Sequence, residues 1–131
     1  MEDIILLDTG AMFTSVMNEG LVANLQKAEI PIEMKTNVGT RHVEIIGELP
    51  GFDKKVWVDN RLVANIFSFA ELASQHRITY DSEKGDVFKV HHGDSVIEFP
   101  RSAEGLYYYR VTDDYKNKMK KNTKAKYMWR H

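Results

Sequence analysis

Apolar and polar positions at the start of the chain predict a strand that ends at a carboxylate. Residues 4–7 are four consecutive aliphatic side chains, a run typical of a strand buried on both faces. Asp8 follows at once, and Gly10 indicates a sharp turn after it. A carboxylate at the mouth of an apolar strand is either hydrogen-bonded by the turn that follows or poised for proton transfer.

The next section alternates between strand and helix patterns. The run of residues 12–17 is short, apolar and compatible with β-structure, so it predicts a second strand. Asn18 is a candidate N-cap, and the apolar spacing within residues 21–25 indicates one or two helical turns. We expect Pro31 to close this section.

A β-hairpin is predicted in the middle of the first half. Apolar and polar residues alternate over residues 30–36, the period of a half-buried strand. A returning strand is expected to stop at Gly47, so residues 34–46 form the hairpin, with its tip near Val38 and Gly39.

Short apolar runs separated by turn residues fill the second half. Residues 48–51 predict a turn through their Pro-Gly pair, and residues 69–73 have helix-forming composition, with Asn65 or Ser68 as the cap. The expected strands are residues 56–58, 77–80, 87–90, 96–99 and 105–111, and residues 62–68 are a second apolar run. Strands repeating about every ten residues are typical of an antiparallel sandwich or barrel, so the fold class is all-β.

Length and composition narrow the function classes. At 131 residues the chain is most simply one domain, and it has no cysteine, which excludes a disulfide, a thiolate nucleophile and a zinc–thiolate site. Its apolar runs are too short to span a membrane, and the N-terminus lacks the pattern of a signal peptide. We therefore expect a cytoplasmic protein without membrane contact.

Charge separates the end of the chain from the rest. Residues 110–131 hold eight Lys or Arg against two Asp, so they carry a net charge of +6 and residues 1–109 the balance of −7. We predict a folded domain over residues 1–111 and a basic, flexible tail over residues 112–131. The tail is either solubilising, the start of a linker, or a weak nucleic-acid contact through phosphate neutralisation.

Three further clusters offer other chemistry. Asp81, in a Tyr-Asp-Ser sequence, is a conceivable second catalytic acid, although a polar hairpin turn also explains it. His91 and His92 are metal-ligand types, but neighbours on a strand point to opposite faces, so a tight turn with exposed imidazoles is the preferred interpretation. Residues 107–109 are three tyrosines that fit either base stacking or an ordinary strand. No metal or organic cofactor is implied.

The order of these motifs resembles a retropepsin-like aspartic protease. The resemblance rests on Leu-Leu-Asp-Thr-Gly-Ala at residues 6–11, the hairpin about thirty residues on, and an apolar run that leads into a short helix. The protease region of copia-type retrotransposon polyproteins is a closer likeness, through Asn-Ile-Phe-Ser at residues 65–68, residues 77–82 and residues 105–108. The resemblance covers roughly residues 3–111 and implies a closed barrel with one or two short helices.

That resemblance implies a mechanism built on a pair of carboxylates. Two adjacent carboxylates share one proton, so one acts as base on a water molecule and the other as acid toward the peptide carbonyl. The chain offers one such motif, so the resemblance implies a homodimer with Asp8 from each subunit at the two-fold axis. Activity would then be highest at acidic to mildly acidic pH.

The same resemblance assigns roles to the neighbouring residues. Thr9 would hydrogen-bond across the dimer, Gly10 would let a backbone amide approach the carboxylate, and Ala11 would line the site. Val38 and Gly39 would form the tip of a flap that closes over a peptide substrate.

Three functions remain open at this point. The first is an aspartic endopeptidase domain of a retroelement polyprotein, acting on polyprotein substrates as a homodimer. The second is an inactive retropepsin-like domain for self-association, in which Asp8 is a structural turn residue. The third is a nucleic-acid-binding module that uses the basic tail.

Overall fold

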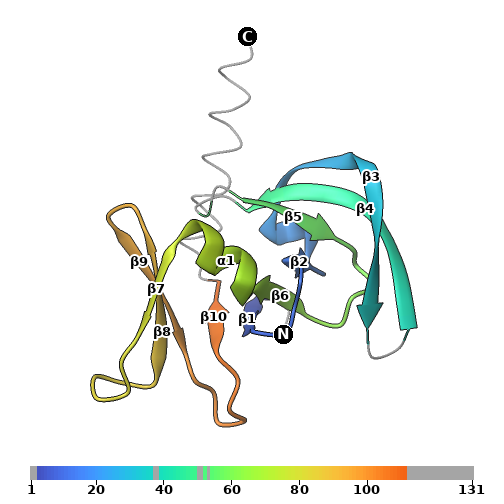
Figure 1. Ribbon diagram of the computed structural model, residues 1–131. Helices are drawn as coiled ribbons and strands as arrows, with labels where there is room; N and C mark the ends of the chain where they lie inside the picture. The colour runs from blue at the N-terminus through green and yellow to red at the C-terminus, as the bar shows by residue number, and fades with distance from the viewer. Residues whose placement is uncertain (1–2, 37–38, 50–51, 53, 112–131) are drawn as a thin grey trace. The chain divides into compact units, whose positions relative to one another are not determined.

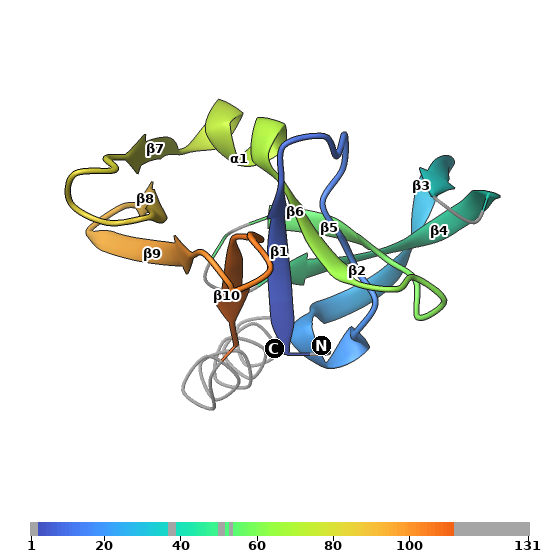
Figure 2. The same cartoon turned by 90° about the horizontal axis from the view of Figure 1, so that it is seen from below.

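The described part of the chain is mostly β-structure. The computed structural model describes residues 3–36, 39–49, 52 and 54–111 (Figures 1 and 2). The strands are β1 Ile4–Asp8, β2 Ser15–Val16, β3 Ala23–Thr36, β4 Gly39–Leu49, β5 Lys54–Val58, β6 Asn65–Ser68, β7 Arg77–Tyr80, β8 Val87–His92, β9 Ser95–Pro100 and β10 Tyr108–Arg110. The helices are the 3-10 turn η1 Glu19–Leu21 and the α-helix α1 Phe69–Gln75. The all-β prediction is confirmed, and within the described residues no helix has the length and apolar character needed to cross a membrane.

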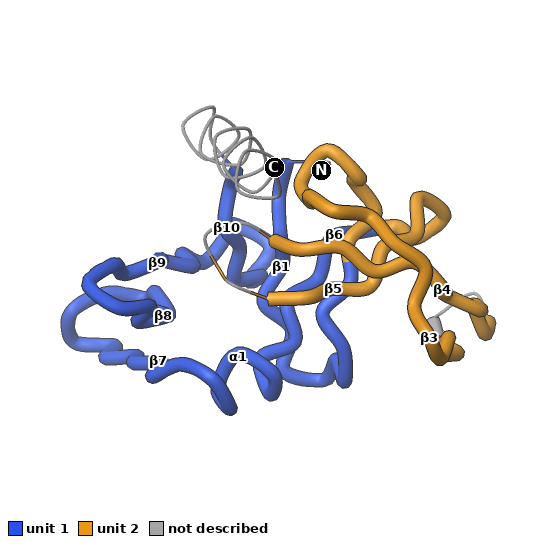
Figure 3. The backbone as a smooth tube through the Cα atoms, turned by 90° about the horizontal axis from the view of Figure 1, so that it is seen from above, with its two compact units in different colours: residues 1–15, 64–111 blue, residues 16–63, 112–131 orange. Residues whose placement is uncertain are grey.

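The chain divides into two compact units, coloured separately in Figure 3. Unit 1 comprises residues 1–15 and 64–111, and unit 2 comprises residues 16–63 and 112–131. The predicted basic tail, residues 112–131, lies outside the described residues.

Unit 1 is built around β1. This strand lies between β10, to which it is antiparallel, and β6, to which it is parallel (Figure 2). The parallel pairing places Asp8 opposite Ser68, where β6 ends and α1 begins. Strands β7, β8 and β9 form a separate antiparallel sheet of the same unit. The buried apolar residues of unit 1 are Ile5, Phe67, Leu72, Val90, Phe99 and Val111.

Unit 2 contains the predicted hairpin, which is longer than the sequence pattern suggested. Strands β3 and β4 pair antiparallel from Ala23 opposite Glu48 to Thr36 opposite Gly39, and β5 pairs with the other edge of β4. The hairpin itself is confirmed, with Thr36 opposite Gly39, while Val38 lies outside the described residues. The buried apolar residues of unit 2 are Val16, Leu21, Val43, Leu49, Phe52, Val56 and Val58.

The helix predicted within residues 21–25 is wrong beyond its first turn. Asn18 does cap η1, since its side chain accepts a hydrogen bond from Gly20 N at 2.9 Å, but β3 begins at Ala23. Asn24 has φ +54°, and between Ala23 and Gln26 the strand carries one residue more than its partner, which is a β-bulge. Backbone pairing with β4 therefore overrides the local helical spacing.

Glycine at position 47 permits close packing against this bulge. A Cβ built there would lie 3.1 Å from Val22 Cβ and 3.2 Å from Leu25 Cδ2. Val22 and Leu25 thus cover the same spot although they are three residues apart. In a regular strand such residues point to opposite faces, so the bulge explains why a strand shows helical spacing here.

Four other predictions are corrected by the described residues. Of residues 12–17 only Ser15 and Val16 form a strand, because the chain bends at Met12 and Phe13. Pro31 does not end the segment, because it lies inside β3. It falls at an irregularity in the pairing, where five residue steps along β3 lie opposite two along β4. The turn predicted at residues 48–51 begins later, because Glu48 and Leu49 still belong to β4 and residues 50–51 lie outside the description.

The fourth correction concerns closure of the sheet. Within the described residues, the strands of neither unit close into a barrel, so the predicted closed barrel is not found. One α-helix and one 3-10 turn agree with the expected one or two short helices.

Candidate functional site

Asp8 lies at the end of β1 and organises the turn that follows. Its Oδ1 accepts a hydrogen bond from Gly10 N at 2.7 Å, so the carboxylate caps its own turn. The Asp8 side chain is half-buried, whereas Thr9 and Gly10 are exposed. Asp8 makes no ion pair within the part of the chain that the structure describes, so its second oxygen is available to another group.

The segment after this turn is fixed to the start of α1. Ser68 Oγ donates to the carbonyl oxygen of Ala11 at 2.7 Å, and Ser68 N donates to Thr14 Oγ1 at 3.0 Å. Thr14 N donates to the Glu71 carboxylate in the first turn of the helix. Thr14 and Ser68 are both buried, so the bond between them is shielded from water, and together with the two partly buried bonds it holds residues 11–14 in one conformation.

Ser68 also caps the helix, which gives a first testable prediction. Its Oγ accepts from Glu71 N at 3.2 Å, in addition to the bond to Ala11. Ser68→Ala removes both interactions, and we expect it to lower the free energy of unfolding by about 2 kcal/mol, measured by urea denaturation. Ser74→Ala is the matched control, because Ser74 is exposed and bonds only the Glu71 carbonyl within the same helix. Equal stability losses in the two variants would contradict this role for Ser68.

The predicted site residues divide between the two units. Asp8, Thr9, Gly10 and Ala11 form one continuous turn in unit 1. Gly39 begins β4 in unit 2 with φ +122°, a conformation that favours glycine, and Val38 lies outside the described residues.

Sequence reasoning identified Ser68 only as an alternative cap and missed Thr14 and Glu71 as anchors of the turn. The signal for Ser68 and Glu71 was present in their spacing, since Ser-x-x-Glu is typical of a helix N-terminus. Asn65, the other cap candidate, belongs to β6 instead, where its Nδ2 donates to the Ile4 carbonyl at 3.0 Å.

The other acid and histidine candidates have local structural roles. Asp81 caps the turn between β7 and β8, because its Oδ1 accepts from Glu83 N at 3.0 Å. His91 and His92 are not in a turn but end β8, and the turn follows at Gly93. The ladder with β9 continues through both histidines, which is why the strand extends past the predicted boundary. No group of three or more metal-ligand side chains converges within the described residues.

Tyr107 and Tyr109, two of the three tyrosines, contact other aromatic rings in unit 1. Tyr107 packs edge-on against Phe88, with ring centroids 4.7 Å apart, and Tyr109 packs against Phe99 at 6.0 Å. The hydroxyls of Tyr107 and Tyr80 both donate to Asp86, at 2.5 and 2.8 Å. The hydrogen bond from Tyr107, followed by that from Tyr80, lowers the pKa of the Asp86 carboxyl. The same bond to Asp86 raises the pKa of the Tyr107 hydroxyl. The rings of Tyr107 and Tyr109 therefore serve packing, as in an ordinary strand.

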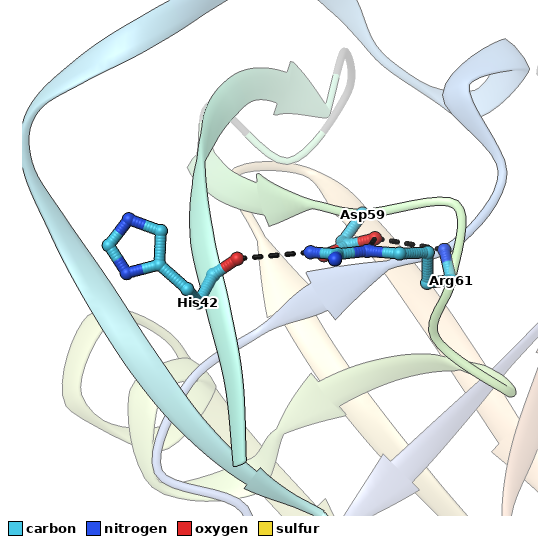
Figure 4. Close-up of polar contacts among 3 residues, drawn as sticks. All are labelled: His42, Asp59 and Arg61. Carbon is cyan, nitrogen blue, oxygen red and sulfur yellow. Dashed lines mark hydrogen bonds and ion pairs between the residues drawn. The ribbon is translucent and has the colours of Figure 1, made fainter.

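A second polar cluster lies at the end of β5 in unit 2 (Figure 4). Asp59 and Arg61 form a two-pronged ion pair, with Arg61 Nε 2.9 Å from Asp59 Oδ1 and Nη2 2.6 Å from Oδ2. Arg61 Nη2 also donates to the His42 carbonyl oxygen at 3.1 Å. The Asp59 side chain is only 7% exposed, and its hydrogen bond with the Arg61 side chain holds the pKa of the carboxyl below its ordinary value of 3.8.

This ion pair makes stability depend on pH. Because the folded-state pKa of Asp59 is lowered, its contribution is complete above the ordinary aspartate value and is lost as pH falls through the folded value. Asp59→Asn keeps an acceptor for Arg61 N but removes the negative charge. We expect it to lower the free energy of unfolding by about 1 kcal/mol near neutral pH, a small value because Arg61 is half-exposed and water screens the ion pair. Urea unfolding of both proteins should show this difference shrinking toward pH values of about 3 and below. A difference independent of pH would contradict it.

Comparison with known proteins adds no family to this geometry. No protein-family model, no curated protein and no solved structure matches the chain.

Proposed function

We propose that this chain is an aspartic endopeptidase domain with a retropepsin-like fold, active as a homodimer. One observation carries the proposal: the Asp8 carboxylate lies at the end of β1, the strand between β10 and β6, in a turn that is held in place. The segment after the turn is hydrogen-bonded through Ala11 to Ser68 at the start of α1. Rigid placement of a carboxylate with one free oxygen is what proton transfer to and from water requires. The cytoplasmic location expected from the sequence remains part of this proposal.

The second carboxylate comes from a second copy of the chain in this proposal. Asp81 is exposed in the turn between β7 and β8, which belong to the sheet that does not contain β1, and Glu83 stands where the motif of Asp8 has a glycine, so Asp81 does not match Asp8 as a second acid. Thr9 is exposed beside Asp8 and is available to bond across a two-fold axis. The β3–β4 hairpin, with Gly39 near its tip, takes the role of the flap over an extended peptide.

The chemistry of the site then follows from the shared proton. The ionised carboxylate removes a proton from water as the water attacks the peptide carbonyl carbon. The protonated carboxyl donates its proton to the carbonyl oxygen, which gives a tetrahedral diol. The carboxyl that took the water proton then passes it to the amide nitrogen while the other carboxylate takes a proton back from the diol, so that the C–N bond breaks and the amine leaves.

Dependence of activity on protein concentration tests the proposal. The purified chain is incubated with an unfolded polypeptide at pH values from about 4 to about 7, and new N-termini are counted. We expect cleavage at acidic to mildly acidic pH, with specific activity that rises with concentration as dimers form. Activity independent of concentration, or absent in a confirmed dimer, would contradict it.

A second candidate is the inactive self-association domain, and one observation favours it. Asp8 caps its own turn through Gly10 N, which is the structural role expected of a non-catalytic aspartate. In that case the chain forms dimers that cleave nothing. The nucleic-acid interpretation depends on residues 112–131, which lie outside the described residues, so it stays a prediction from the sequence.

A further inference from the structure

Unit 2 contains a pocket of about 370 Å³ that the proposed catalytic turn does not use. It opens beside the ion pair of Figure 4. Its walls come from η1, β4 and the end of β5, and the lining residues are Glu19, His42, Glu44, Ile45, Val58, Asp59, Asn60 and Arg61.

The one guanidinium of this lining is already neutralised. Arg61 is hydrogen-bonded to both oxygens of Asp59 and to the His42 carbonyl. Its charge is therefore balanced by Asp59, and its orientation is fixed by these bonds. Two carboxylates remain. Glu19 is exposed and makes no ion pair within the described ranges, and Glu44 meets only Lys27 Nζ at 3.9 Å, a long contact between solvent-exposed groups. The lining residues therefore carry an excess of negative charge, while Arg41, outside the lining, is a further cation that acts on Asp59.

The shape of the lining distinguishes an organic cation from a metal ion. The acidic groups and His42 do not converge on a common point, since no metal-binding group is found among the described residues. Ile45 and Val58, which pair across β4 and β5, supply an apolar surface between them. Carboxylates and apolar side chains that line one pocket are complementary to a long side chain with a cationic end, because the alkyl stem and the charge each meet a matching partner.

We propose that this pocket binds the side chain of an arginine or lysine in an extended peptide. The identification of the ligand as a peptide rests on the proposed endopeptidase function, whereas the preference for a cation rests on the pocket alone. Position supports the peptide, because His42 and Glu44 belong to β4, the strand that begins at Gly39 of the proposed flap. The pocket thus selects substrates that carry a basic residue.

Binding without turnover tests this inference. The full chain carrying Asp8→Asn is labelled with ¹⁵N and titrated with a blocked pentapeptide, Gly-Gly-Arg-Gly-Gly, or its citrulline analogue, which is nearly isosteric but neutral. We expect the arginine peptide to shift the amide signals of Glu19, His42 and Asn60 saturably, and to bind about fivefold more tightly than the citrulline peptide. Equal binding of the two peptides would overturn the proposal.

A pair of charge-matched variants separates the pocket from the overall charge of the protein. Glu19→Gln with Glu44→Gln should weaken binding of the arginine peptide about fivefold or more. Glu29→Gln with Glu33→Gln removes the same charge from exposed positions of β3 outside the pocket, and binding should be retained. An equal loss in both double variants would show a general charge effect and would overturn the proposal.

Kinetics keep this inference distinct from the proposed function. If the wild type cleaves peptides, the Glu19/Glu44 double variant should raise KM for arginine-containing substrates about fivefold and leave kcat unchanged. A fall in kcat with unchanged KM would overturn the inference. Since the titration needs no cleavage, an inactive protein that still prefers arginine over citrulline contradicts only the endopeptidase proposal. An active protein without that preference contradicts only the pocket.

Discussion

Asp8→Asn is expected to reduce peptide cleavage by about 10³-fold or more while the protein stays folded. The amide of asparagine retains a carbonyl oxygen that accepts the hydrogen bond from Gly10 N, so the turn after β1 is preserved. What is lost is the ability to take a proton from water and return it. The measurement is the initial rate of peptide cleavage at mildly acidic pH, with circular dichroism and sedimentation as checks on fold and dimer.

Asp81→Asn is the matched control for this experiment. Asp81 also caps a turn through its own Oδ1. It belongs to an Asp-Ser sequence and is the alternative candidate, within the same chain, for the second catalytic acid. The variant should retain full activity. If Asp81→Asn were as inactive as Asp8→Asn, an intrachain pair of acids would replace the homodimeric site. If Asp8→Asn remained active, the structural interpretation of Asp8 would stand instead.

Phe67→Ala is expected to lower the free energy of unfolding by about 4 kcal/mol. Phe67 is completely buried in β6, beside β1, and its ring packs edge-on against Phe99 with centroids 5.7 Å apart. Truncation removes the aromatic contact and leaves a cavity between the two sheets of unit 1. Urea denaturation monitored by tyrosine and tryptophan fluorescence measures the change.

A loss of this size is comparable to the whole stability of many domains, so a milder variant is included. Phe67→Leu should lose about 1 to 2 kcal/mol and remain folded. Met12→Ala is the control, because Met12 is 78% exposed and its truncation should change stability by less than about 0.5 kcal/mol. Similar losses at Met12 and Phe67 would show that residue 67 is not part of the core.

Local sequence patterns predicted those parts of the fold whose hydrogen bonds are made nearby. The helix at α1 was expected from composition, with Asn65 or Ser68 as its cap, and the structure confirms the helix with Ser68 as the cap. The β3–β4 hairpin was also expected, because alternation and a glycine turn are local signals. The failure at residues 21–25 has a specific cause. Asn24 in a left-handed conformation places Val22 and Leu25 over Gly47, so a bulged strand acquires the spacing of a helix.

The sequence predicted the turn of the candidate site but not the residues that anchor it. An aliphatic run that stops at Asp8 and Gly10 indicated a capped turn, and the bond from Gly10 N to Asp8 is that turn. The anchors were not predicted as a group, because Thr14 and Ser68 are 54 residues apart and meet only when β6 lies parallel to β1. A parallel pairing leaves no local turn signal, since its strands are joined by a long connection.

By itself, the sequence determined that this is a β-rich chain with a carboxylate at the end of an apolar strand, because strand period, turn residues and helix caps depend on near neighbours. Only the tertiary structure decided which distant groups hold that turn, how the Arg61 charge is neutralised by Asp59, and that Glu19 and Glu44 face one pocket. These relations depend on strand order and register, which are fixed by packing and backbone pairing over the whole chain rather than by any short stretch of it.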